Sequence, residues 1–566
     1  MESTAAGPTR VPPQPVGTRV RLAEPPGTTP VVLDGTTLDT PGVVRLADGA
    51  AVPVVPPRAL ARARRSWEAA ERLAAAGRMY GRGTGVGAHR SVTVDAADAA
   101  GHGLRLLRSH AGGAGDPLPA RQVRAMLAVR ANQLLAGGSG IQPAFATALA
   151  EALRLGVHPA VHEYGGLGTG DLTALAETGL TLIGERPWLG TAVPAAAAFP
   201  AGSAVSAGAT VSAGRAADGL PAPLTLWPGD ALALLSSNAL TLGQAALACH
   251  DLDVLLCASH AVTALSLAAV SGSPEAYAAP VHALRPYPGV ARAAAEVRRL
   301  LALPDRRRGG GRRIQDPFGF RAFPQAHGPA LDAVAHLGGI LDVEINCPSE
   351  NPLIALGEAN EANEANESEG DEEVEGGEGG EGGEGGEGNA GATVYHHGGF
   401  YAAPLGLALD GLNLAVLGTA QLSAARLTAL GRPDLTGLPG FLAAGPASSS
   451  GTMILEYTAT SALAELRAAA AAPASAGHAV LSHGLEESAS FAGQAARQSL
   501  RAAHAYRTVL ACELVTAVRA LRLHPEPPRS PAFVHAAAVL PADTADRPLT
   551  ADVATAAELL AELAQL

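Results

Sequence analysis

A glycine-rich run between Tyr164 and Leu172 has the composition of a site for an electrophile or an anion. It reads Tyr-Gly-Gly-Leu-Gly-Thr-Gly-Asp-Leu, and a helical pattern begins at Asp171. Glycine allows tight turns and close approach of neighbouring groups. The N-terminus of the following helix would point unpaired N–H groups and the positive end of its dipole at the loop. Taken alone, the loop is better explained as a turn at the start of a helix, because short glycine patterns are weak evidence of a site.

Several short motifs accompany this loop in a fixed order. Before it come Tyr-Gly-Arg-Gly-Thr-Gly-Val-Gly at residues 80–87 and Ser-His-Ala-Gly-Gly-Ala-Gly-Asp-Pro-Leu at residues 109–118. After it come Gln-Asp-Pro-Phe-Gly-Phe-Arg at residues 315–321, Glu-Asn-Pro-Leu at residues 350–353 and the segment 482–490. In order, these five resemble the YGxNTGFG, SHAAGVGEPLP, QDxYSxR, DNPL and SANQEDHVS motifs of the histidine/phenylalanine ammonia-lyase family. The resemblance covers nearly the whole chain.

The resemblance implies a cofactor made from the chain's own backbone. In that family an Ala-Ser-Gly tripeptide cyclises and loses water to give methylidene-imidazolone (MIO), whose alkene lets an amino acid lose ammonia and its β-proton. Gly168-Thr169-Gly170 occupies this place. Ordinary side chains offer no strong electrophile, and the chain has no lysine to hold pyridoxal phosphate. We therefore expect a self-derived imidazolone and neither pyridoxal phosphate nor a metal.

Three departures from the family's pattern fall where the chemistry would occur. The motif is one residue shorter here, so its alanine is missing or replaced by Gly168, and its serine is replaced by Thr169. A threonine-derived alkene would carry an extra methyl group that makes it a bulkier and weaker acceptor. Phe318 stands at the family's catalytic tyrosine, and phenylalanine can neither donate nor accept a proton. The asparagine of the family's LxNGT motif aligns with Ser236 without a gap, or with Asn238 after a short shift.

Other site residues are kept, and their roles are implied by the resemblance. Tyr80 matches the base that removes the β-proton; its pKa, ordinarily about 10, must be lowered for this role, and a nearby helix N-terminus would help. Arg321 is expected to bind the substrate carboxylate through its bidentate guanidinium. Gln315 is expected to position the substrate or bond the imidazolone carbonyl. Outside these motifs, a hydrogen-bonded buried tyrosine and a structural ion pair would explain Tyr80 and Arg321.

Two features indicate the class of substrate. The pair Ser109-His110 resembles histidine-specific members of the family, whereas phenylalanine and tyrosine enzymes differ there. Glu486 also matches the histidine type, in which a carboxylate meets an imidazole, and both side chains suit a polar ring. Separately, a core histidine and a helix-capping glutamate would explain them. Together they favour histidine or a related aromatic amino acid as the substrate.

Three functions remain open at this point. The first is an ammonia-lyase with a threonine-derived imidazolone that yields an α,β-unsaturated acid. The second keeps the fold and pocket without the cofactor and catalyses another reaction, such as an isomerisation, on an amino-acid-like ligand. The third is a non-catalytic homologue that binds a ligand or partner, an alternative motivated by the three departures together.

The elements that must position these residues are mainly helical. Apolar residues recur at three- and four-residue spacing in 60–76, 121–135, 143–155 and 171–182. The segments 405–417, 453–471 and 488–521 are apolar on several faces, which is typical of helices buried in a bundle or at a subunit interface. Strand-like alternation is mainly confined to the first hundred residues, for example 31–33 and 91–94. The fold class we predict is a long-helix bundle of the ammonia-lyase (fumarase/aspartase-like) type with a small mixed N-terminal region.

Composition shifts suggest the domain boundaries. Residues 1–30, rich in Pro, Gly and Thr, are expected to form a disordered tail. Residues 355–392 repeat Glu-Ala-Asn and Gly-Gly-Glu and are expected to be a disordered acidic insert rather than a metal-binding or partner-binding segment. Between them we predict an N-terminal domain at 31–235 carrying the glycine-rich loop. A central bundle at 236–354 and 393–524 and a C-terminal helical segment at 525–566 complete the chain.

Composition also excludes several partners. The formal charge of −13 is local, because 13 of the 53 acidic residues lie between Glu358 and Glu387, which leaves 40 acidic residues to face 40 arginines. Nothing therefore suggests nucleic-acid binding, and no run of roughly 18 uninterrupted apolar residues suggests a membrane span. The four scattered cysteines fit reduced thiols in a cytoplasmic protein. By resemblance we expect a homotetramer whose active sites combine three chains and bind a small amino acid.

Overall fold

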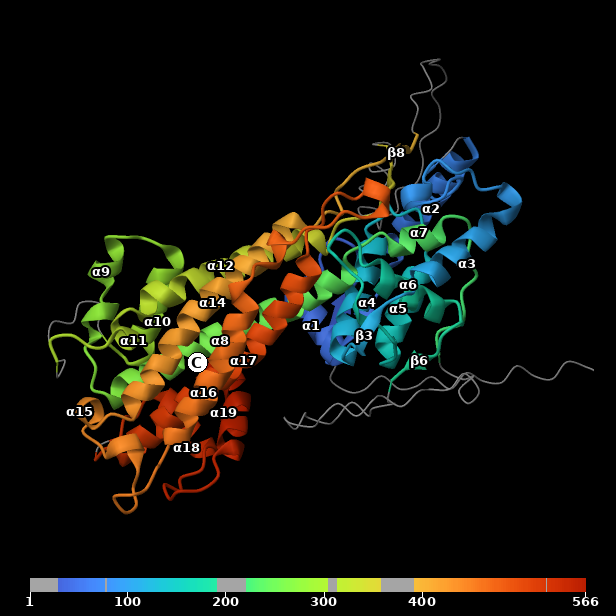
Figure 1. The fold of residues 1–566 in the computed structure, drawn as a ribbon. Helices are drawn as coiled ribbons and strands as arrows, with labels where there is room; N and C mark the ends of the chain where they lie inside the picture. Colours follow the sequence, from blue (N-terminus) through green and yellow to red (C-terminus); the bar gives the residue numbers. More distant parts are fainter. Residues whose placement is uncertain (1–28, 77–78, 191–219, 304–312, 358–390, 526) are drawn as a thin grey trace, which may run out of the picture.

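The computed structural model describes residues 29–76, 79–190, 220–303, 313–357, 391–525 and 527–566 and is mainly helical. Figure 1 shows two regions: a compact N-terminal region on the right and a bundle of long helices on the left. The predicted tail 1–30 and acidic insert 355–392 lie almost entirely outside the described residues. The predicted fold class is confirmed by this architecture.

Helices of the N-terminal region surround the glycine-rich loop. They are α1 (Thr40–Asp48), α2 (Pro57–Ala76), α3 (Ala99–His110), α4 (Ala120–Leu135), α5 (Ala144–Leu155), α6 (Leu172–Leu182) and α7 (Asp230–Leu235). Strands here are short and pair in twos: β1 (Thr29–Val32) with β2 (Ala51–Val54) in parallel, and β3 (Ala114–Pro117) with β5 (His162–Tyr164) and β4 (His158–Pro159) with β6 (Trp188–Leu189) in antiparallel fashion. A further antiparallel pair, β7 (Leu353–Ala355) and β8 (Thr393–Tyr395), flanks residues 358–390.

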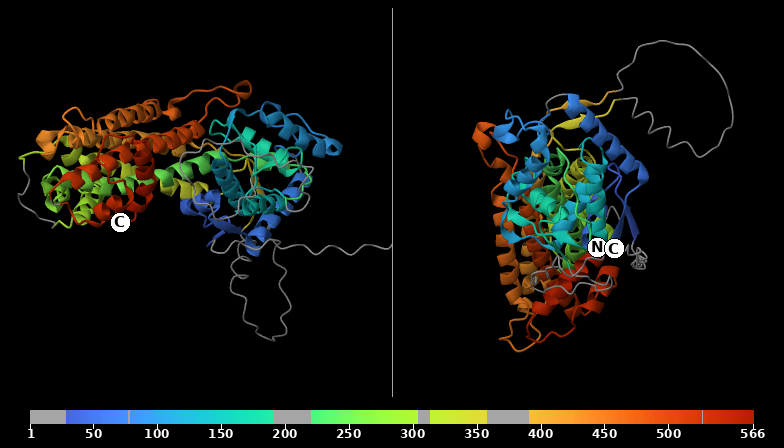
Figure 2. Two further views of the ribbon diagram at one scale, coloured as in Figure 1. Left: turned by 90° about the horizontal axis from the view of Figure 1, so that it is seen from below. Right: turned by 90° about the vertical axis from the view of Figure 1, so that its right-hand side faces the viewer.

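Long helices form the second region, and Figures 1 and 2 show them running side by side. They are α8 (Ala239–Ala269), α10 (Pro288–Leu300), α12 (Phe323–Glu344), α14 (Ala403–Leu430), α16 (Met453–Ala471), α17 (Ala492–Leu523) and α19 (Thr550–Leu563). Shorter helices connect them: α9 (Ala279–Ala283), α11 (Phe318–Arg321), α15 (Pro433–Thr436) and α18 (Pro531–Val539). Helix α8 is the central element, because it packs against α4 of the N-terminal region and against α12 and α17 of the bundle.

The predicted elements differ from the structure in three places. Strands are expected mainly in the first hundred residues, but six of the eight strands in the described residues, β3 to β8, lie after residue 100. All four helices predicted within 60–182 form with ends within a few residues of those expected. The segment 91–94 is not a strand; within it only Thr93 makes a single bridge, to Thr84. The helix predicted from residue 488 begins at Ala492, because Phe491 lies in the left-handed region at φ 52°. Residues 488–491 are thereby left as a loop, which becomes important at the candidate site.

Two helical segments, Asp230–Ala269 and Ala403–Leu430, are long and apolar enough to cross a membrane by length and composition. The most apolar window of the first is 78% buried inside the fold, and that of the second is 56% buried. Core helices of soluble proteins pass the same test, so these segments are weak evidence for a membrane. The less complete burial of α14 leaves Leu407 and Leu414 exposed.

A buried ion pair joins the helices at the far end of the bundle. Arg426 of α14 donates from Nε and Nη2 to the two carboxylate oxygens of Glu513 of α17, at 2.6 and 2.8 Å, and both side chains are 0% exposed. Ser266 of α8 and Ser423 of α14 donate to the same carboxylate. Arg426 also donates to the carbonyl oxygen of Gly319 in α11. The Glu513 carboxylate therefore connects α8, α14 and α17, and Arg426 connects this group to α11 through its hydrogen bond to Gly319.

Replacing Glu513 by Gln is expected to lower the free energy of unfolding by about 3–5 kcal/mol, because the Arg426 charge stays buried without its counter-ion. Urea denaturation followed by circular dichroism measures the loss. Asp434→Asn is the matched control, because Asp434 pairs with Arg432 on the protein surface and its loss should leave the transition unchanged. Equal transitions for the two variants would contradict the role given to this pair.

Candidate active site

The glycine-rich loop lies where four helices begin. Helix α6 follows it directly, and Asp171 N–H donates to the carbonyl oxygen of Ser237, just before α8. Ala402, the residue before α14, donates its N–H to the Gly168 carbonyl oxygen at 3.2 Å. Phe491, the residue before α17, donates its N–H to the Leu167 carbonyl oxygen at 2.8 Å. The N-termini of α6, α8, α14 and α17 thus meet at residues 167–171.

This convergence makes the loop electrostatically positive. Each helix N-terminus carries unpaired N–H groups and the positive end of a dipole. None of the four helices has an acidic residue in its first turn, although the Asp171 carboxylate, just before α6, accepts from the first turn of α8. Negative charge that develops at the loop is stabilised by the other helix N-termini.

The tripeptide Gly168-Thr169-Gly170 forms a sharp bend in the loop. Gly168 and Gly170 have φ values of 78° and 116°, which favour glycine, and the chain bends at Gly168 and Thr169. Both glycines are buried, whereas Thr169 is partly exposed. The Gly168 carbonyl oxygen accepts from Ser490 Oγ at 2.8 Å, and Gly170 N–H donates to Asn238 Oδ1 at 2.9 Å. The backbone atoms are held from both sides, while the Thr169 side chain can meet a ligand.

Asn238, rather than Ser236, is the residue that contacts this tripeptide. Its side-chain amide accepts from Gly170 and donates to the Phe400 carbonyl oxygen at 2.6 Å, so it joins two loops. Ser236 instead accepts from the N–H of Asn351 at 2.9 Å. Of these two candidates, Asn238 is therefore the one that contacts the tripeptide.

Asp171, the residue that follows the tripeptide, is buried. Its carboxylate accepts from the backbone N–H and the hydroxyl of Thr241, in the first turn of α8, at 2.8 and 3.0 Å. Burial raises the pKa of Asp171 to about 6, although the hydrogen bonds from Thr241 oppose this effect. Asp171 therefore ties the start of α6 to the start of α8.

Tyr80 lies on a neighbouring loop near Glu486. Its hydroxyl oxygen accepts from the N–H of Gly87 at 2.8 Å, and Ser482 Oγ accepts from the N–H of Ala88, which holds the segment of Glu486 against this loop. Burial raises the pKa of Tyr80, and the nearby Glu486 carboxylate raises it further, against the lowering effects of the Gly87 N–H and Arg90. The expected lowering of the Tyr80 pKa is therefore wrong for the isolated chain, because burial outweighs the Gly87 hydrogen bond and Arg90.

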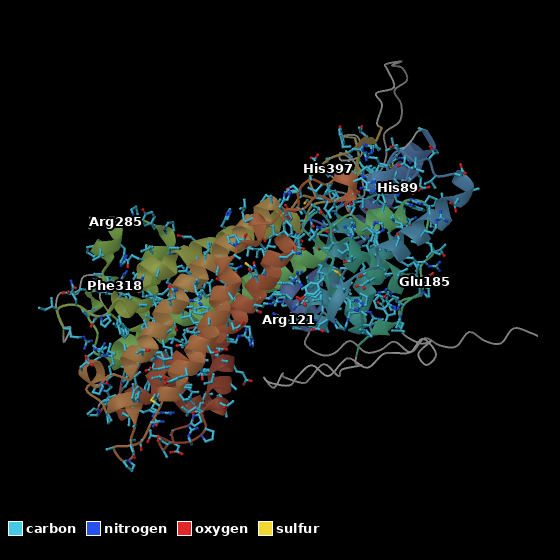
Figure 3. All side chains as sticks on the ribbon, viewed as in Figure 1. His89, Arg121, Glu185, Arg285, Phe318 and His397 are labelled. Carbon is cyan, nitrogen blue, oxygen red and sulfur yellow. The ribbon has the colours of Figure 1, made fainter. Side chains whose placement is uncertain are left out.

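The remaining predicted residues come from two other parts of the fold. Ser109 and His110 end α3, where His110 Nδ1 lies 2.9 Å from the Leu106 carbonyl oxygen and 3.1 Å from Ser109 Oγ. Gln315, Phe318 and Arg321 lie at the opposite end of the bundle, and Figure 3 shows Phe318 far from His89 and His397. There the Arg321 guanidinium lies 4.1 Å from the centre of the Phe318 ring, which is 64% exposed.

Sequence reasoning missed two groups that contact the tripeptide. Ser490 lies inside the matched segment 482–490, but its contact with Gly168 depends on how the chain enters α17. The N–H of Ala402 carries no side-chain signal at all. Within the ranges that the structure describes, no group of three or more His, Cys, Asp or Glu side chains could hold a metal ion.

Comparison with known proteins places these features in context. The sequence model of the family described as aromatic amino acid lyase matches residues 38–541. Histidine ammonia-lyase from Geobacillus kaustophilus is 32% identical over 495 residues, which cover 86% of this chain and 88% of the relative. Among solved structures, histidine ammonia-lyase from Trypanosoma cruzi has a TM-score of 0.78 at 25% identity, covering 94% of this chain and 93% of that one. Tyrosine aminomutase from Streptomyces globisporus has a TM-score of 0.79 at 26% identity, covering 94% and 97%.

The Asp171 carboxyl is expected to make stability depend on pH. Its pKa rises from about 3.8 in the unfolded chain to about 6 in the folded one, so its stabilising effect is complete below about pH 4 and is lost as pH rises through 6. From about pH 4 to pH 7, the unfolding free energy of the wild-type protein should therefore fall relative to that of Asp171→Asn by about 2.4 kcal/mol. Urea titrations of both proteins across this range measure the shift.

Asp546→Asn serves as the control with the opposite sign. Hydrogen bonds from the N–H groups of Ser450 and Gly451 lower the pKa of Asp546. Its contribution is therefore lost as pH falls, not as it rises. If the unfolding free energies of Asp171→Asn and the wild-type protein changed equally with pH, the pKa of Asp171 would not differ between the folded and unfolded states.

Proposed function

Because the chain belongs to the aromatic amino acid lyase family, we propose that it is a carbon–nitrogen lyase that eliminates ammonia from histidine or a related aromatic amino acid and leaves an α,β-unsaturated acid. The observation that carries the proposal is the meeting of four helix N-termini at Gly168-Thr169-Gly170. An electron-accepting group at this position would be activated by the same positive field that stabilises an anion.

The residues of the loop fit a self-derived imidazolone. Glycines on both sides of Thr169 allow the backbone to close on itself, and hydrogen bonds hold the Gly168 carbonyl and the Gly170 N–H. Once formed, the group supplies an electrophilic alkene that activates the substrate for loss of ammonia. Thr169 would place an extra methyl on that alkene, so access to it depends on the partial exposure of residue 169.

Side chains around the loop would bind and deprotonate the substrate. Tyr80 is proposed to remove the β-proton, and Glu486 to accept a hydrogen bond from an imidazole ring. Ser109 and His110 would complete the ring pocket. Because burial raises the pKa of Tyr80 in the isolated chain, its role as a base needs a cation nearby, and the Arg321 guanidinium is the group in the motif that would supply it.

Assembly into a homotetramer would bring Arg321 to Tyr80. The two residues lie at opposite ends of one chain, so a shared site requires Gln315, Phe318 and Arg321 from another copy. Apolar side chains on the bundle surface support such contacts: Leu407, Leu414, Ile454 and Tyr457 are each more than half exposed. Gln315 and Arg321 would then hold the substrate carboxylate, while Phe318 adds an apolar wall without proton chemistry.

A different reaction on an amino-acid-like substrate is the alternative, and the raised pKa of Tyr80 together with Thr169 and Phe318 favours it. Such an enzyme would use the same pocket without the imidazolone. A non-catalytic protein that binds the same class of ligand is the remaining possibility, motivated by the same departures.

Intact-mass spectrometry tests the proposed electrophile. The wild-type protein is expected to be lighter than its sequence by two waters, about 36 Da, and to release ammonia from histidine with the appearance of an unsaturated product. Thr169→Ala removes the hydroxyl that leaves as the second water, so the full deficit and the activity should both be lost, whereas Thr169→Ser should keep both. A wild-type mass equal to that of the sequence would overturn the imidazolone and favour the alternative.

Mixing two inactive variants tests the shared site. Tyr80→Phe and Arg321→Ala are each expected to be inactive alone, because every site lacks one group. Co-expression should restore a measurable fraction of activity, since some mixed sites receive Tyr80 from one copy and Arg321 from another. Absence of recovery in assembled mixed oligomers would contradict the proposal that these residues act across chains.

A further inference from the structure

We propose that the Ser490 hydroxyl is a catalytic group for the ring closure of Gly168-Thr169-Gly170, an inference that rests on the imidazolone of the proposed function. Ser490 is 3% exposed, and its Oγ donates to the Gly168 carbonyl oxygen at 2.8 Å. The Ala402 N–H donates to the same oxygen at 3.2 Å. Two preorganised donors on one carbonyl oxygen form a site for the negative charge that appears when a nucleophile adds to its carbon.

The hydrogen bonds around Ser490 run in the direction that this role requires. The N–H of Ala492, in the first turn of α17, donates to Ser490 Oγ at 3.4 Å. The helix N-terminus therefore polarises the hydroxyl, which passes its own hydrogen to the Gly168 oxygen. On the other side of the bend, Asn238 Oδ1 accepts from the Gly170 N–H and positions this nitrogen, the nucleophile of the closure.

The ring closure needs no oxidant and no other reactant, because it only forms one ring bond and releases two waters. A bond forms between the Gly170 nitrogen and the Gly168 carbonyl carbon, and the carbonyl oxygen leaves as water with the amide protons of Gly170 and Thr169. A second water takes the Thr169 hydroxyl and its Cα hydrogen. The charge on the Gly168 oxygen is greatest while the new bond forms, so the Ser490 donor acts on the first of these two losses.

This arrangement also gives a reason for glycine at residue 168. A Cβ added to Gly168 would overlap Ser490 Oγ, and the φ of 78° disfavours any side chain. In this chain the Ser490 hydroxyl therefore occupies the space that an alanine side chain at residue 168 would need. Glycine at residue 168 allows the hydroxyl to approach the carbonyl of that same residue.

The time course of intact mass in purified protein tests the inference. Ser490→Ala should slow the loss of two waters by about 100-fold, the usual effect of removing one such donor. The variant should therefore be purified largely at its sequence mass and lose about 36 Da slowly on incubation. Ser499→Ala is the matched control, because Ser499 is a buried serine in α17, the helix that follows Ser490, and it donates to the Ala495 carbonyl oxygen. Its mass deficit should equal that of the wild-type protein.

A backbone variant removes the second donor. Ala402→Pro, at a residue with φ −82°, replaces the N–H by a ring carbon that displaces the Gly168 oxygen, so the folded variant should also close slowly. Circular dichroism melting identifies the folded variants to compare. If the wild-type protein carries the deficit and folded Ser490→Ala acquires it equally fast, the role of Ser490 is overturned. If the wild-type protein lacks the deficit, the proposed electrophile itself fails.

Discussion

Four helix N-termini directed at one seven-residue loop, residues 165–171, are the constraint on which the rest of this structure depends. Such an arrangement is costly unless the unpaired N–H groups find acceptors, because orphan backbone donors are unfavourable when buried. The carbonyl oxygens of Leu167 and Gly168 and the carboxylate of Asp171 supply acceptors for three of the four helices. The loop and the helices therefore stabilise each other, and the same contacts concentrate positive potential at Thr169.

Long helices separate Arg321 from the glycine-rich loop of the same chain. Helix α8 has 31 residues and spans about 46 Å. It begins at the glycine-rich loop, and near its other end Ser266 bonds to Glu513. The Arg426–Glu513 pair there holds α11, which carries Phe318 and Arg321. A rigid bundle of this length keeps Arg321 away from its own chain's tripeptide, which is the separation that the proposed multi-chain site would bridge.

The departures from the family's pattern differ in their consequences for packing and for chemistry. Gly168 is accommodated, since the space of an alanine side chain is filled by Ser490. Phe318 removes a proton donor but keeps an aromatic face, on which Arg321 stacks. Thr169 has the most direct effect on chemistry, because its methyl would stay on the reactive alkene. Tyr80, although unchanged in type, depends on its surroundings, because burial and Glu486 both favour its neutral form.

The sequence by itself determined the family, the helical class and most helix positions, because these follow from ordered motifs and from local periodicity. It also singled out Thr169 and Phe318, since a missing side-chain group can be seen without coordinates. Only the tertiary structure selected Asn238 over Ser236, placed Ser490 on the Gly168 carbonyl and separated Arg321 from Tyr80. These features depend on contacts between residues far apart in the chain and on left-handed turns such as Phe491, which no local pattern specifies.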